Sequence, residues 1–195
     1  MKKLTPYQLT KISRNLDYYF NKATKQEIKT GLNWYKDANN ICKDIATKYN
    51  TTTLIAAQVI SALSPRNKWD KNIKDSYKVF EAIKNGIPAE SIKVSTFHTN
   101  KFKSYAIINN NVQITDKSLK TYNFVNNIAL LSENHITIDI WHLRACFSRI
   151  IKIDKANVGR VAYQQIKELT IKKANKLGIK GYELQAIIWG SIRNE

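Results

Sequence analysis

The sequence has few of the residues that cross-link or break a polypeptide chain. It contains two cysteines, six glycines and three prolines in 195 residues. Cys42 and Cys146 lie in apolar helical patterns and not at paired metal-ligand spacing, so the sequence indicates neither a disulfide framework nor a zinc or iron–sulfur site. Long linkers are usually rich in glycine and proline, which are scarce here, so we expect one folded unit.

Long hydrophobic runs are also missing, although hydrophobic residues make up 43% of the chain. No run approaches the roughly 18 apolar residues that cross a bilayer. The N-terminal segment MKKLTPYQLTKISRN has no apolar stretch of signal-peptide length. We therefore expect a soluble protein of the reducing cytoplasm, with no membrane partner.

Negative charge is scarce as well. The chain has 15 acidic residues against 32 Lys and Arg, which gives a formal net charge of +17. Such a charge exceeds what solubility requires and repels itself unless a polyanion is bound. The alternative is a solvated lysine-rich surface, produced by the amino-acid bias of an AT-rich genome. The size of the charge favours nucleic acid as the partner.

Helical periodicity runs along almost the whole chain. Thr5 with Pro6 is an N-cap and first-turn pair, and TTTLIAAQVISAL predicts a core helix that Pro65 stops. The predicted helices cover residues 5–20, 25–48, 54–63, 68–84, 88–93, 99–109, 117–131, 139–151, 156–177 and 182–193. Only residues 136–138 look extended, and one such segment cannot form a sheet. The sequence therefore predicts an all-α fold.

Lys120 occupies an unusual place in the helix predicted over residues 117–131. It extends an apolar stripe of Phe124, Ile128 and Leu131. It also lies in the first turn, where the helix dipole disfavours a positive charge. A partly desolvated, neutral lysine is what a Schiff-base nucleophile requires, because only the neutral amine attacks. The alternative is that Lys120 extends into water or contacts a phosphate.

Asp139, in ITIDIWHLRACFSRI, stands at the start of another predicted helix. Its carboxylate can accept a hydrogen bond from the N2 or N3 amide, which contributes about 1 kcal/mol. His142 lies away from the face that we expect to pack. That face comprises Ile140, Leu143, Phe147, Ile150 and Ile151. Capping alone explains Asp139, but a carboxylate held in this way also has a fixed position for catalysis.

Lys120 and Asp139 together resemble the helix-hairpin-helix (HhH-GPD) DNA glycosylase superfamily. In that family the second helix of the hairpin carries a lysine, and a V-D-x-H-like segment carries an aspartate. The matching segments here are KSLKTYNFVNNI and ITIDIWHLRACFSR. VISALSPRNKWDKNIKDSYKVF is similar to the family's early helix-loop-helix, and LQAIIWGSIRN to its final core helix. The resemblance covers about residues 54–194 and is nearest to the 8-oxoguanine DNA glycosylase/AP lyase branch.

This resemblance implies a two-lobed helical glycosylase-like fold with a degenerate helix-hairpin-helix. Residues 1–195 would form a single glycosylase-like unit, with residues 52–131 as its central lobe. Residues 1–50 and 139–195 would form the second lobe.

The family's hairpin usually reads L-P-G-V-G, whereas this chain has QITDKS. Without glycine the backbone amides do not approach a phosphate as they do in the family. Lys117, Ser118 or Lys101 would therefore have to replace them.

The function that the resemblance implies is excision of a damaged or modified base, with an 8-oxoguanine-like purine favoured, in base excision repair. Lys120 would attack the deoxyribose and nick the strand by β-elimination, and Asp139 would stabilise the transition state. Neither a metal nor an organic cofactor is implied. The partner would be double-stranded DNA, bound by a monomer in the cytoplasm of a bacterial or phage-infected cell and associated with the nucleoid.

The resemblance also implies DNA contacts. Arg66 and Asn67 would fill the gap that the flipped base leaves, whereas the alternative for this loop is a solvated basic turn. The other expected DNA contacts are Lys68, Lys71, Lys117, Ser118 and His142.

The residues expected to line a base pocket are Gln58, Trp141, Gln185 and Trp189. For these the alternatives are core tryptophans and buried amides that are satisfied internally. The rival functions are a non-catalytic DNA-binding protein on the same scaffold, and a structural or regulatory protein that assembles with another polyanion.

Overall fold

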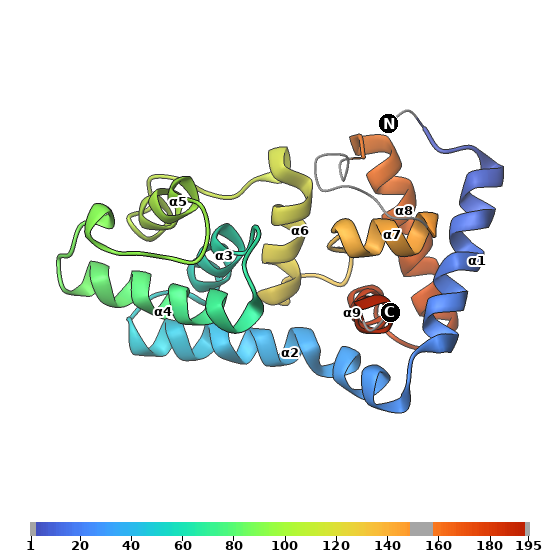
Figure 1. Cartoon of the computed structure of the whole chain (residues 1–195), viewed down its shortest axis with the longest axis horizontal. Helices are drawn as coiled ribbons and strands as arrows, with labels where there is room; N and C mark the ends of the chain where they lie inside the picture. Colours follow the sequence, from blue (N-terminus) through green and yellow to red (C-terminus); the bar gives the residue numbers. More distant parts are fainter. Residues whose placement is uncertain (1–2, 149–157, 194–195) are drawn as a thin grey trace. The chain divides into compact units, whose positions relative to one another are not determined.

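The computed structural model describes residues 3–148 and 158–193, which fold into helices and loops without a β-strand (Figure 1). The α-helices are α1 (Pro6–Lys22), α2 (Lys25–Lys48), α3 (Thr53–Leu63), α4 (Trp69–Lys84), α5 (His98–Ile108), α6 (Leu119–Ile128), α7 (Ile140–Phe147), α8 (Arg160–Lys176) and α9 (Gly181–Arg193). Two short 3-10 helices, η1 (Ala89–Ser91) and η2 (Asp116–Ser118), precede α5 and α6. The all-α prediction is confirmed.

The chain divides into two compact units. Unit 1 comprises Met1–Asp37 and Leu130–Glu195, and unit 2 comprises Ala38–Ala129. The first boundary falls inside α2, whereas the sequence placed it after that helix, near residue 50. A periodic pattern does not reveal such a boundary, because the two halves of one continuous helix have the same sequence signature.

Helix starts follow the capping signals in the sequence. Thr5 Oγ1 accepts a hydrogen bond from Gln8 N at 3.2 Å, and Gln8 Oε1 accepts one from Thr5 N at 2.9 Å. This reciprocal pair is a capping box, with Pro6 as the first helical residue. At the start of α3, Thr52 Oγ1 accepts from Ile55 N at 3.1 Å. The Thr5 cap was predicted and is confirmed, and of the two threonines that could begin the second helix, Thr52 and Thr53, Thr52 is the cap.

The centre of unit 2 is α3. Its residues from Ala56 to Leu63 are all buried, and it packs against α4, α5 and α6. A helix that is apolar nearly all round can bury every face only when neighbours surround it. The prediction that this helix belongs to a core is confirmed.

In unit 1, α1, α7, α8 and α9 pack against one another (Figure 1). The start of α2 also approaches α9 closely, at Gly31. A Cβ added to Gly31 would lie 2.5 Å from Ile187 Cγ1 and 2.7 Å from its backbone N. Only glycine fits at this contact, because the backbone of α9 cannot move aside as a flexible side chain would.

Several predicted helices are shorter in the structure. The helix predicted over 88–93 is only the 3-10 helix η1, and the helix predicted over 156–177 begins at Arg160, as α8. The helix predicted over 117–131 begins as η2 and continues as α6, which ends at Ile128, shortly before the left-handed Leu130. The helix predicted over 139–151 ends at Phe147, where Ser148 is left-handed at φ 45°. The remaining predicted positions of that helix, including Ile150 and Ile151, lie outside the described residues. In the parts of the chain that are described, no helix combines the length and apolarity needed to cross a bilayer.

Candidate catalytic residues and nucleic-acid interface

The buried segment that leads to Asp139 is held in place by one tyrosine. The Tyr163 hydroxyl, from α8, donates to Ile136 O at 2.8 Å and accepts from Ile138 N at 3.1 Å. Residues 136–138 are the only ones that the sequence marked as extended. Within residues 3–148 and 158–193 they have no partner strand, and the hydroxyl satisfies two of their backbone groups.

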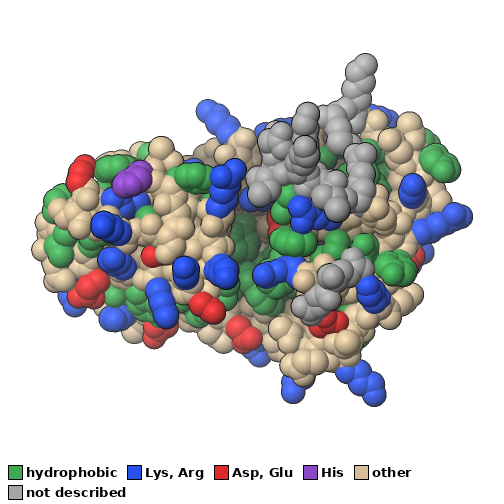
Figure 2. Space-filling view, viewed as in Figure 1, with side chains coloured by type: hydrophobic (Ala, Val, Ile, Leu, Met, Phe, Trp, Pro, Cys, Tyr) green, Lys and Arg blue, Asp and Glu red, His purple; other side chains and the backbone are tan. Residues whose placement is uncertain are grey.

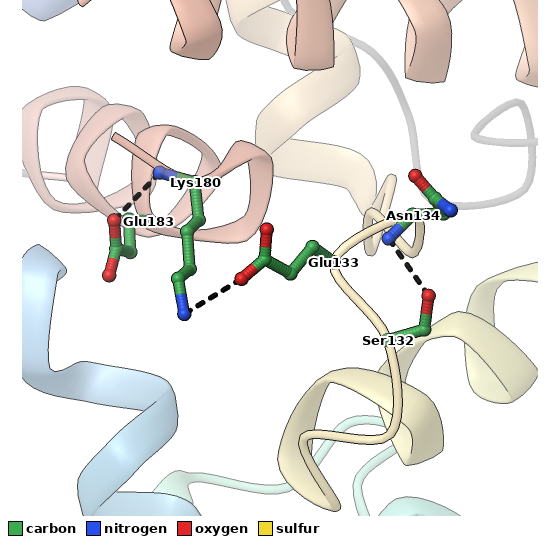
Figure 3. A network of polar contacts seen from close by, with 5 residues as sticks. All are labelled: Ser132, Glu133, Asn134, Lys180 and Glu183. Carbon is green, nitrogen blue, oxygen red and sulfur yellow. Dashed lines mark hydrogen bonds and ion pairs between the residues drawn. The ribbon is translucent and has the colours of Figure 1, made fainter. Parts of the chain in front are cut away.

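A polar network fixes the loop before this segment (Figure 3). Lys180 Nζ lies 2.9 Å from Glu133 Oε1, and Lys180 N donates to Glu183 Oε2 at 2.8 Å. The bond to Glu133 raises the pKa of the Lys180 ammonium above its usual value. Within the same loop, Asn134 N donates to Ser132 Oγ at 3.2 Å. The approach to Asp139 is thus tied to the start of α9.

Asp139 caps α7 as predicted. Its Oδ1 accepts from His142 N at 2.9 Å, and the residue is half-buried. The cap fixes the orientation of the carboxylate, because the oxygen is bonded to a backbone amide of a packed helix. Asp139 therefore stands at a rigid helix start in unit 1.

A buried tyrosine lies within electrostatic reach of Asp139. Tyr35 donates to Gln185 Oε1 at 2.7 Å, and both residues are buried. Burial raises the pKa of the Tyr35 hydroxyl far above its usual range, a hydrogen bond with Thr137 lowers it, and the negative charge of Asp139 raises it again. Tyr35 therefore keeps its proton. Gln185 is a satisfied buried amide, which was the alternative to its place in a base pocket.

His142 is not where the sequence placed it. Its side chain is fully buried, and Nε2 lies 3.2 Å from Thr170 Oγ1. Burial lowers its pKa to about 4, so the ring is neutral at physiological pH. The prediction that His142 faces DNA is wrong for this structure. Helix α7 packs against both α1 and α9, so it buries a second face that a single apolar stripe does not reveal.

Tryptophan and arginine side chains stack beside one another in unit 1. The Arg144 guanidinium lies 4.6 Å from the ring centroid of Trp141. The Arg193 guanidinium lies 5.9 Å from Trp141 and 4.4 Å from Trp189. Trp189 in turn lies 6.3 Å from Trp34, between ring centroids. We call these five residues the Trp–Arg stack; Arg193 is exposed and the other four are half-buried.

Lys120 lies in unit 2, in the first turn of α6 as predicted, but its side chain is exposed. Of the stripe predicted to desolvate it, Ile128 is buried and Phe124 is half-buried, but the burial does not extend to Lys120. Leu131 lies beyond the helix and is 57% exposed, and the buried face of α6 runs through Asn123 and residues 125–128 instead. The predicted hairpin residues Lys117 and Ser118 are exposed beside it. Ser118 makes no side-chain capping bond, so the first amides of α6 lack that partner.

A loop in unit 2 projects Arg66. Its backbone is left-handed, at φ 55°, which is uncommon for a residue with a side chain. Its guanidinium lies 5.3 Å from the ring centroid of Phe97, which is 50% exposed. The sequence drew attention to Arg66 through the break at Pro65. The sequence did not indicate Phe97 as a site residue, because Phe97 is far from Arg66 along the chain and comes close to it only in the folded protein.

Of the other residues in unit 2 that were predicted to bind DNA or line a base pocket, some are exposed and others form hydrogen bonds inside the protein. Lys68 and Lys71 are exposed, as a phosphate contact requires. Asn67 Nδ2 instead donates inward, to Asp75 Oδ2 at 3.0 Å. Gln58 is buried, and its Oε1 accepts from Ile114 N at 2.8 Å, so it is a satisfied amide. Lys101, expected as a substitute phosphate contact, is 1% exposed and donates to Ile92 O at 2.7 Å.

Positive charge is spread over the molecular surface. Figure 2 shows lysine and arginine side chains across the visible face, with acidic side chains between them. Among the described residues, no three His, Cys, Asp or Glu side chains form a group that could hold a metal ion. Exposed lysine and arginine side chains are groups on this surface that attract a polyanion.

Comparison with known proteins gives a family and no characterised relative. The family described as "Family of unknown function (DUF7178)" matches residues 1–195. No curated protein and no solved structure matches the chain.

Proposed function

The chain belongs to this family of unknown function, and we propose that it is a bifunctional DNA glycosylase/AP lyase that excises a damaged or modified base. The observation that carries the proposal is the position of Asp139. It is a half-buried carboxylate at the start of a packed helix, and its approach is fixed by Tyr163. A carboxylate so held supports a positive charge that develops on a substrate, because its orientation costs nothing further during reaction.

Lys120 supplies the nucleophile in this proposal. Its neutral Nζ forms a bond to C1′ of the deoxyribose, and the C1′–N bond breaks, its electron pair leaving with the base, which takes up a proton. Asp139 stabilises the oxocarbenium character at C1′. Opening of the sugar ring gives a Schiff base on Lys120. Loss of a proton from C2′ then expels the 3′ phosphate by β-elimination, and water releases the lysine.

The exposure of Lys120 sets a condition on this chemistry. A lysine in water is protonated at neutral pH, and only the neutral amine attacks. Bound DNA must therefore exclude water from Lys120 before reaction.

Base extrusion needs a group that fills the gap in the duplex. In the proposal Arg66 takes this role together with Phe97, whose ring is half-exposed beside it. A planar guanidinium and an aromatic ring both stack on bases, which offsets the few kcal/mol that unstacking costs. Lys68 and Lys71, exposed in and next to the same loop, contact phosphates.

The experiment that tests the proposal is a panel of duplex oligonucleotides that carry 8-oxoguanine, other damaged bases or modified bases. Base release and strand nicking are scored separately for each duplex. The wild-type protein is expected to release at least one base, and Lys120→Gln to abolish release. The matched control is Lys84→Gln, which removes an exposed lysine of unit 2 that is not among the expected DNA contacts. No release from any duplex would contradict the proposal.

The exposure of Lys120 favours a second function, that of a non-catalytic DNA-binding protein. An exposed lysine at an uncapped helix start binds phosphate without any chemistry. This function predicts tight, strongly salt-dependent binding to duplex DNA with no product from the panel. If binding has no steep salt dependence, both DNA functions fail.

A further inference from the structure

We propose that a hollow in unit 1 binds the phosphodiester backbone of DNA through three lysines of α8, Lys167, Lys172 and Lys176. The inference rests on the proposed function for the identity of the nucleic acid. It gives unit 1 a phosphate site that involves neither Lys120 nor the loop of Arg66.

The hollow lies on the solvent-exposed face of α8, beside the loop that leads to Asp139. It has a volume of about 620 Å³. Asn134 lines it on the side of the loop, and α8 supplies its other lining residues, all of them exposed or half-buried. A pocket for a small molecule usually encloses most of its ligand. An open hollow instead admits a polymer that continues beyond it on either side.

Positive charge predominates in the hollow. Against its three lysines stands one acidic residue, Glu168, whose Oε1 accepts from Gln164 Nε2 at 2.7 Å. Lys173 of the same helix lies outside the hollow and is paired with Asp17. Within residues 3–148 and 158–193, the three lysines of the hollow form no such ion pair. Their charge is therefore available to an anionic ligand.

The two sides of the hollow are held together by the fold. Tyr163 of α8 donates to Ile136 O and accepts from Ile138 N, shortly after the loop. The loop is also tied to the start of α9 by the ion pair between Lys180 and Glu133 (Figure 3). The backbone around the hollow is therefore in place before a ligand binds, and only the lysine side chains have to be ordered.

The positive charge of Lys167 acts on the loop. Burial lowers the pKa of His135, the residue after Asn134, and the charge of Lys167 lowers it further. A lysine is a compact charge on a flexible stem, so it contacts phosphates without the fixed geometry of an arginine fork. Such contacts hold a strand but do not read its sequence. An enzyme that removes a damaged base from any sequence requires contacts of this kind.

The test measures binding to a duplex that contains a tetrahydrofuran abasic-site analogue, which has no aldehyde and does not react with Lys120. Affinity is determined at several salt concentrations. The variant combines Lys167→Gln, Lys172→Gln and Lys176→Gln. We expect the slope of log K against log[salt] to fall in magnitude by about 2.7, because each phosphate contact contributes about 0.9. Binding at 0.1 M salt should weaken about tenfold or more.

The matched control combines Lys11→Gln, Lys25→Gln and Lys29→Gln, which removes the same charge from exposed lysines elsewhere in unit 1. Its slope should change much less. If both triple variants change the slope equally, or if the wild-type protein does not bind the duplex, the inference is overturned. Thermal unfolding of each variant shows that it is folded.

A second pair of variants tests the position of the charge with every lysine in place. Asn175→Glu adds a negative charge to the lining of the hollow, and Gln26→Glu adds the same charge to an exposed position of α2 in unit 1. We expect Asn175→Glu to bind the duplex more weakly, because the new carboxylate competes with phosphate for the lysines. Equal affinities of the two variants would overturn the inference.

These measurements are independent of catalysis. If no base is released from any duplex but the slopes change as expected, the proposed function fails and the phosphate site stands on a non-catalytic protein. If base release depends on Lys120 and the two triple variants have equal slopes, the proposed function stands and the phosphate site does not.

Discussion

The carboxylate of Asp75 accepts a hydrogen bond from Asn67 Nδ2 at 3.0 Å, with the same oxygen that accepts from Ser95 N at 2.7 Å. One buried carboxylate thereby joins the loop that carries Arg66 to the loop that carries Phe97. Thr96 Oγ1 adds a third bond between them, to Pro65 O at 2.7 Å. Asp75 lies in α4, so this helix holds the two loops whose side chains are proposed to fill a gap in the duplex.

Asp75→Ala removes this junction. It leaves two donors without their acceptor, and we expect a loss of about 2 kcal/mol in the free energy of unfolding. Urea denaturation followed by circular dichroism measures the loss. Asp37→Ala removes an exposed aspartate and is the control, with an expected change within about 0.5 kcal/mol. Equal effects of the two substitutions would show that Asp75 does not join the loops.

Arg66→Gly is expected to change stability and activity in opposite directions. Glycine adopts a left-handed backbone without strain, so the free energy of unfolding should rise by up to about 1 kcal/mol. Removal of the guanidinium should reduce base release from a lesion duplex at least tenfold. Arg66→Ala, which keeps the strain and loses the side chain, separates the two effects. Undiminished base release by both variants would exclude Arg66 from base extrusion.

Substitutions of Asp139 distinguish a cap from a catalytic carboxylate. In Asp139→Asn the side-chain oxygen still accepts from His142 N, so we expect little loss of stability. Asp139→Ala should lose about 1 kcal/mol through the missing cap. Base release should fall by several orders of magnitude in both variants. An Asp139→Asn protein with wild-type activity would show that Asp139 is only a cap.

His142 makes the stability of unit 1 depend on pH. Burial lowers its pKa from 6.5 in the unfolded chain to about 4 in the folded protein, so the unfolded state binds the proton first as the pH falls. Stability is therefore fully present above about pH 6.5 and is lost as the pH falls toward 4. The expected loss from this group is about 3 kcal/mol.

Denaturation midpoints measured between pH 7 and pH 4.5 test this dependence. His142→Gln keeps a polar group near Thr170 and does not titrate, so its stability should fall less over the same range. Parallel curves for the wild-type protein and the variant would exclude His142 as the source.

Local signals were enough to predict much of the fold. The caps at Thr5, Thr52 and Asp139 depend on residues three positions apart, and the periodic segments between them form helices as expected. A hydrogen bond within one turn leaves its signature in a short window of sequence. The all-α fold follows from the same windows.

Burial and contact between distant residues could not be predicted in this way. His142 is buried because α7 packs against α1 and α9 and its ring lies against Thr170 of α8. Lys120 is exposed because it lies outside the buried face of α6, which runs through Asn123 and residues 125–128. The Asp75 junction and the Trp–Arg stack join segments far apart in the chain. No short stretch of sequence contains both partners of such a contact. A periodic pattern therefore shows which faces are apolar, but it does not show which distant residues come into contact.

A Schiff base on Lys120 distinguishes the proposed lyase from a protein that only binds DNA, and borohydride trapping detects it. The wild-type protein is incubated with a duplex that contains an abasic site, in the presence of borohydride, and the product is digested and analysed by mass spectrometry. We expect a covalent complex in which the sugar is attached to Lys120, and no complex with Lys120→Gln. A wild-type protein that binds the duplex but gives no adduct, or gives one on another lysine, would contradict it.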